Sequence, residues 1–85
     1  MPMKYVMLKL YSGELLPLLF PEFMQHSHMA QSVPATVVSA GHVYLESGKI
    51  IARGASRSLD VISREEDSGI MQAYFDGRNV VQQEL

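Results

Sequence analysis

The three histidines are the residues best suited to bind a metal ion. His26 and His28 stand two positions apart, and His42 follows later in the chain. Residues two apart point away from each other on a helix and share a face only on a strand. No Asp or Glu lies within residues 23–45 to complete or orient a site. We therefore predict no metal site, and interpret two histidines as surface residues of a helix and the third as a strand residue.

Basic residues with regular spacing form a second candidate group. Lys49, Arg53 and Arg57 share the same parity, so a straight strand would align them on one face, with Arg64 a little further along. Such a stripe contacts the phosphates of nucleic acid. However, the net charge is −2, whereas nucleic-acid-binding domains usually carry a basic excess. Gly54 is also expected to break the strand. Nucleic acid is thus the alternative partner, with these four residues as candidate phosphate contacts.

No motif for nucleotide binding or covalent catalysis is complete. Gly48-Lys49 lacks the Gly-x4-Gly-Lys-Ser/Thr context of a phosphate-binding loop, and Gly54-Ala55-Ser56 lacks the second glycine of a nucleophile elbow. The absence of cysteine excludes thiol nucleophiles, disulfides and thiolate metal sites. We therefore expect no catalytic residue, no cofactor and no enzymatic activity.

The composition is that of a small folded domain. The 85 residues, of which 47% are apolar and 19% charged, suffice for one domain over residues 1–85. The longest apolar run, residues 15–20, is far shorter than the roughly 20 residues of a membrane span. The N-terminus has no long apolar run followed by a small-residue cleavage site. We expect a cytoplasmic protein that is not membrane-bound.

The first half of the chain predicts a hairpin followed by a short helix. Residues 4–11 alternate as a strand, and residues 15–20 return after a turn. Pro17 places the return strand at a sheet edge or beside a bulge, because proline lacks an N–H donor. Proline and glutamate at residues 21–22 favour a helix that runs to about Gln31.

The second half predicts another hairpin. Residues 35–46 are rich in valine and form a strand with a bulge or bend at Ala40-Gly41. Ser47-Gly48 is a strong signal for a hairpin turn. The return strand at residues 49–53 can continue past Gly54.

A second helix follows this hairpin. Ser63 and Glu66 fit a capping box, and Gly77 is the expected terminator. The tail at residues 78–85 either pairs as a last strand or frays.

Residues 54–67 carry a resemblance to a known group. The pattern Gly-x-Ser-x-Ser-Leu, followed by Ser-Arg-x-Glu-Asp, resembles short uncharacterised proteins encoded in bacteriophage and prophage genomes. The resemblance covers roughly the second half of the chain. It implies no activity and no functional residues.

Together these patterns predict a single α+β domain of order ββαββα. Two hairpins form an antiparallel sheet of about four strands, with two helices on one face. The open face of the first strand and the leucine-rich edge then favour contact with another chain. We expect a non-enzymatic interaction protein that self-associates as a homodimer or binds another protein. Its candidate interface consists of Tyr5, Met7, Tyr11, Leu16 and Leu18.

Overall fold

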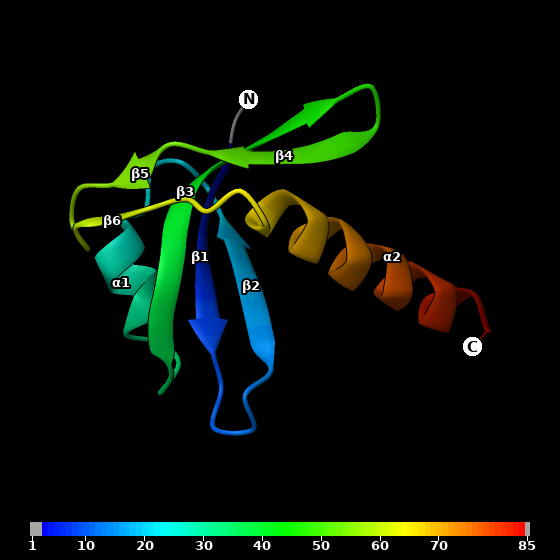
Figure 1. Ribbon diagram of the computed structural model, residues 1–85, viewed down its shortest axis with the longest axis horizontal. Helices are drawn as coiled ribbons and strands as arrows, with labels where there is room; N and C mark the ends of the chain where they lie inside the picture. The colour runs from blue at the N-terminus through cyan, green and yellow to red at the C-terminus, as the bar shows by residue number, and fades with distance from the viewer. Residues whose placement is uncertain (1–2, 85) are drawn as a thin grey trace.

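The six predicted elements occur in the expected order, and two further short strands lie between the fourth strand and the last helix. The computed structural model describes the backbone of residues 3–84 and the side chains of residues 3–77. The α+β class is confirmed. In chain order the elements are β1 (Met3–Lys9), β2 (Leu15–Phe20), α1 (His26–Ala30), β3 (Thr36–Glu46), β4 (Lys49–Arg53), β5 (Ala55–Ser56), β6 (Val61–Ile62) and α2 (Asp67–Glu84) (Figure 1).

The main sheet joins the two hairpins through their first strands. Its order is β2-β1-β3-β4, with every neighbouring pair antiparallel, as predicted. The short strands β5 and β6 pair separately. The register between β1 and β3 shifts where Met7 faces Ser39 and Leu8 faces Val37, so Val38 is the extra residue of a bulge. The bulge therefore lies slightly before the predicted position at Ala40-Gly41.

Gly41 serves close packing instead. A Cβ atom at this position would lie 2.7 Å from the backbone oxygen of Arg53. A side chain there would push β3 and β4 apart, so this glycine allows the two backbones to approach.

The two helices cover opposite faces of the sheet, and the prediction of both on one face is wrong. Tyr5 and Met7 pack with Met71 of α2, whereas the alternate residues of β1, Val6 and Leu8, pack with residues around α1. Both sets are apolar because a central strand covered on two sides has no solvent-facing set. The protein thus has two small cores, one on each face.

Both helices also differ from their predicted lengths. The helix expected from residue 21 begins only at His26, and the side chain of its N-cap residue, Gln25, makes no capping hydrogen bond. A turn with a hydrogen bond from Met24 N to Pro21 O occupies the expected first helical turn. In the other direction, α2 continues through Gly77 to Glu84, because a glycine inside a helix costs only about 1 kcal/mol. Residues 78–84 are therefore helical, not a strand or a frayed tail, and Leu85 lies outside the described residues.

Candidate apolar binding groove

A buried hydrogen bond anchors the start of α2 to the sheet. Tyr5 Oη donates to Asp67 Oδ2 at 2.5 Å, and both side chains are fully buried. Arg64 holds the same carboxylate through its backbone N–H at 3.0 Å and its Nε at 3.1 Å. The predicted capping box is therefore wrong: Asp67 fills the role expected of Glu66, and the backbone N–H of Ser63 donates to Gly54 O instead.

The environment of this anchor keeps Asp67 ionised and Tyr5 neutral. Burial alone raises the pKa of Asp67, but the nearby hydroxyl of Ser39 and the hydrogen bonds from Tyr5 and Arg64 outweigh burial and hold that pKa below its ordinary value. Burial, followed by the neighbouring Asp67 carboxylate, raises the pKa of Tyr5 far above its ordinary value. Because neither side chain is exposed, we assign the pair to positioning α2 and not to chemistry on a substrate.

The anchored helix protects one edge of the sheet. Ser68 Oγ accepts a hydrogen bond from Ala52 N at 2.8 Å, and Gln72 Oε1 accepts one from Ile50 N at 2.8 Å. These two amides belong to the edge strand β4. The side chains of α2 thus satisfy donors that would otherwise be open to strand addition. They also fix the helix beside β4, where it forms one wall of a groove.

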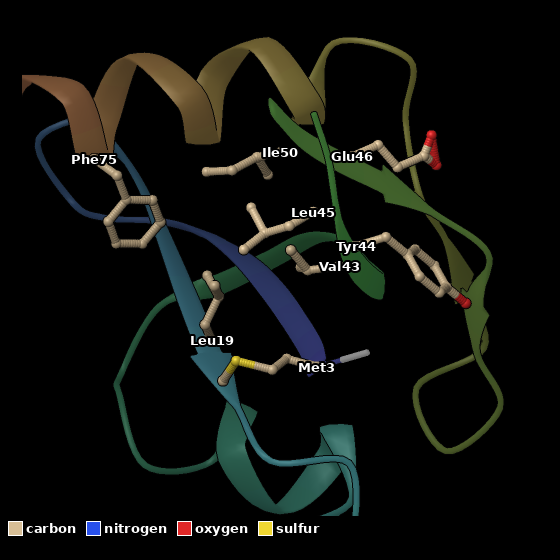
Figure 2. A pocket seen from close by; sticks show the side chains of 8 residues that line it. All are labelled: Met3, Leu19, Val43, Tyr44, Leu45, Glu46, Ile50 and Phe75. Carbon is tan, nitrogen blue, oxygen red and sulfur yellow. The ribbon is translucent and has the colours of Figure 1, made fainter. Parts of the chain in front are cut away.

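An open groove of about 490 Å³ lies between α2, the β3–β4 hairpin, the start of β1 at Met3 and the end of β2 at Leu19. Figure 2 shows apolar side chains converging on it, while Tyr44 and Glu46 point away. Alternation along β3 explains the difference, because Val43 and Leu45 face the groove and their neighbours face the other side. We call the following six residues the apolar groove: Met3, Leu19, Val43, Leu45, Ile50 and Phe75.

Exposure varies within the apolar groove. Val43 at its floor is 6% exposed, whereas Leu45 on the hairpin is 75% exposed. Figure 1 shows this hairpin extending beyond β1 and β2, on the side where α2 runs. The groove therefore has a recessed apolar floor and a projecting apolar rim.

None of the predicted interface residues lines this groove. Tyr5 and Met7 are fully buried within the chain under α2, so their interpretation as partner contacts is wrong. Tyr11 is fully exposed in the turn after β1. Leu16 and Leu18 pack partly buried against the core on the α1 side. The alternation of Val43 and Leu45 was the missed sequence signal. It places both side chains on one face of β3, but only the packing of segments far apart in sequence shows that this face lines a groove.

The basic stripe weighed as the alternative does not form, because β4 ends at Arg53 and the chain turns at Gly54, as expected. The guanidinium of Arg53 lies 4.5 Å from the ring centre of Tyr44 and 3.7 Å from Glu46. Arg64 Nη2 lies 3.0 Å from Asp67 Oδ1. Lys49 stands beside the hairpin turn at the start of β4, and Arg57 follows β5.

Of the three histidines, His28 lies exposed on α1 and His42 lies on β3, as predicted, whereas His26 differs from its expected position. His26 is buried, not on the surface, and its Nε2 lies 2.8 Å from Gly41 O. Its ring contacts those of Phe20 and His42 edge to face, while His28 is exposed. Within the part of the chain that the structure describes, no group of three His, Cys, Asp or Glu side chains could hold a metal ion.

A comparison with protein-family models, curated proteins and solved structures finds no match. Within residues 3–84, no helix is both long enough and apolar enough to cross a membrane. The role of the apolar groove must therefore be inferred from its own residues.

Proposed function

We propose that this chain is a non-enzymatic, cytoplasmic interaction protein that forms a homodimer through the apolar groove. The observation that carries the proposal is the convergence of six apolar side chains, from four strands and one helix, around an open volume of about 490 Å³. Exposed apolar surface of this kind marks contact sites on small proteins. A domain of 85 residues also has a thin core, and association is a common remedy.

The shape of the groove favours a second copy of the same chain as its occupant. A two-fold dimer needs one surface that complements itself. The projecting Leu45 and the recessed floor at Val43 lie on the same surface. A two-fold axis beside the hairpin would bring each Leu45 over the floor of the other copy.

The charge of the groove supports the same choice. Among the side chains that the structure describes, Glu46 is the one charged residue lining the volume, and it points away from the apolar cluster (Figure 2). A charged partner segment would lose hydration there without gaining a counter-charge. The uncharged groove of a second copy avoids that cost, so self-association is favoured over capture of a charged peptide.

Substitution at Leu45 tests this proposal by sedimentation equilibrium. Full burial of a leucine side chain contributes about 1.5–3 kcal/mol. Because Leu45 is mostly exposed and occurs twice in a dimer, Leu45→Lys should cost about 3 kcal/mol in total, or roughly a hundredfold in dimer dissociation constant.

Ile62 provides a matched control for this substitution. It is 70% exposed, also lies on a strand and does not line the apolar groove. Ile62→Lys should leave the dissociation constant unchanged. A wild-type chain that stays monomeric at millimolar concentration would overturn the proposal, and so would equal effects of the two substitutions.

A further inference from the structure

A second pocket lies on the opposite face of the sheet, beside α1, and is distinct from the apolar groove. Its volume is about 360 Å³. Lys4 and His42 are directly opposite each other on β1 and β3, and their sequence neighbours Met3 and Val43 line the apolar groove instead. Because side chains alternate between the two faces of β1 and β3, the polar residues reach this pocket and their apolar neighbours reach the apolar groove. The polar groups of this pocket come from Lys4, Gln25, His26, His42, Arg57 and Ser58.

The charged and titratable groups of the pocket are all basic. Lys4, His26, His42 and Arg57 line it, and no Asp or Glu among residues 3–77 does. Asp60, the acidic residue nearest to Arg57 in sequence, makes no ion pair with it in the described structure. The pocket therefore concentrates positive charge in a chain whose net charge is −2.

Several donors in this pocket remain available to a ligand. Lys4 Nζ donates to Met24 O at 2.9 Å, which uses one of its three N–H bonds. Arg57 has no hydrogen bond or ion pair within the described residues. Ser58 Oγ accepts from Ser27 N at 3.1 Å and lies 3.4 Å from Ser56 Oγ, so its hydroxyl proton can point either to Ser56 or to a ligand.

The pKa of His26 reflects the positive charge around the pocket. Burial is the largest cause that lowers the pKa of His26, and the charges of Lys4 and His42 lower it further, against the hydrogen bond to Gly41 O. His42 faces Lys4 on β1, His26 on α1 and Arg53 across on β4, all of them basic. An anion in the pocket would relieve this repulsion.

We propose that this pocket binds the phosphate group of a small phosphorylated molecule, with Arg57 and Lys4 as its charged donors. Phosphate suits the site because a dianion with several acceptor oxygens matches multiple convergent cationic donors. Ser58 adds a neutral hydroxyl, and His42 a ring nitrogen, to the lining of the same pocket. The volume of about 360 Å³ falls in the range of small-molecule sites.

The test is an NMR titration of the full chain with inorganic phosphate, adenosine monophosphate and a single-stranded oligonucleotide without terminal phosphate. We expect saturable shifts at the amides of Ala55, Arg57 and Ser58 with the first two probes. Adenosine monophosphate should bind more tightly than phosphate alone, because the pocket extends beyond one phosphate group. Binding of the oligonucleotide alone would overturn the proposal in favour of nucleic acid, and absence of saturable binding would overturn it outright.

Two arginine substitutions distinguish phosphate binding in the pocket from nonspecific attraction of an anion to positive charge. Arg57→Gln should weaken phosphate binding by about tenfold or more, because a hydrogen bond to a charged group is lost. Arg53→Gln removes the same charge from a residue held by Tyr44 and Glu46, and should retain binding within about twofold. Equal losses in both variants would contradict the assignment.

Discussion

Replacing Tyr5 with phenylalanine removes one oxygen atom from the core and leaves the ring in place. In the folded protein this oxygen donates to Asp67 Oδ2 at 2.5 Å, and both groups are fully buried. A hydrogen bond to a charged group contributes about 1.5–3 kcal/mol. Arg64 still neutralises the carboxylate, so the larger penalty of an unpaired buried charge does not arise. We therefore expect Tyr5→Phe to lower the free energy of unfolding by about 2 kcal/mol.

Chemical and thermal denaturation measure this loss. For a domain of this size, 2 kcal/mol corresponds to a fall in melting temperature of roughly 8–16 °C. Tyr11→Phe is the matched control, because the Tyr11 ring is fully exposed, and it should change the unfolding free energy by less than about 0.5 kcal/mol. In an Asp67→Asn background the effect of Tyr5→Phe should shrink, because the charged acceptor is gone.

The same pair predicts a pH dependence. The pKa of Asp67 is lower in the folded protein than in the unfolded chain, so folding favours the ionised form. This contribution is complete above the unfolded value, about pH 4, and is lost as pH falls through the folded value. The stability difference between wild type and Tyr5→Phe should therefore narrow in acid. The reasoning is refuted if Tyr5→Phe matches Tyr11→Phe, or if its effect is equal in the Asp67→Asn background.

Two further predictions concern a glycine and a buried histidine. Gly41→Ala should destabilise the fold by about 1–3 kcal/mol in urea denaturation, because its Cβ would lie 2.7 Å from Arg53 O. Gly69→Ala, at an exposed position of α2, should be neutral or stabilising. The lowered pKa of His26 predicts a loss of stability as pH falls below the unfolded histidine value of about 6.5, because the unfolded chain then binds the proton more readily. Measured unfolding free energies should lose part of this dependence in His26→Gln and keep it in His28→Gln; equal slopes in the two variants would contradict the assignment to His26.

The residue types in the turns allowed both hairpins to be predicted from the sequence. The bounds of β2 and the turn between β3 and β4 were both predicted. Ser47 and Gly48 have φ values of 53° and 78°, the positive pair that a two-residue hairpin turn requires. The helix ends were less predictable, because neither the lack of a cap at Gln25 nor the continuation through Gly77 leaves a decisive local signal.

The sequence by itself determined the α+β class, the four antiparallel strands and the incomplete catalytic motifs, because these depend on residues close together in the chain. It also showed that both faces of β1 are apolar, through the alternation of Tyr5 and Met7 with Val6 and Leu8. Only the tertiary structure decided what covers each face. Alternation defines two sides of a strand but carries no information about which distant segment packs there. The buried Tyr5–Asp67 anchor, the apolar groove and the basic pocket all depend on such long-range packing.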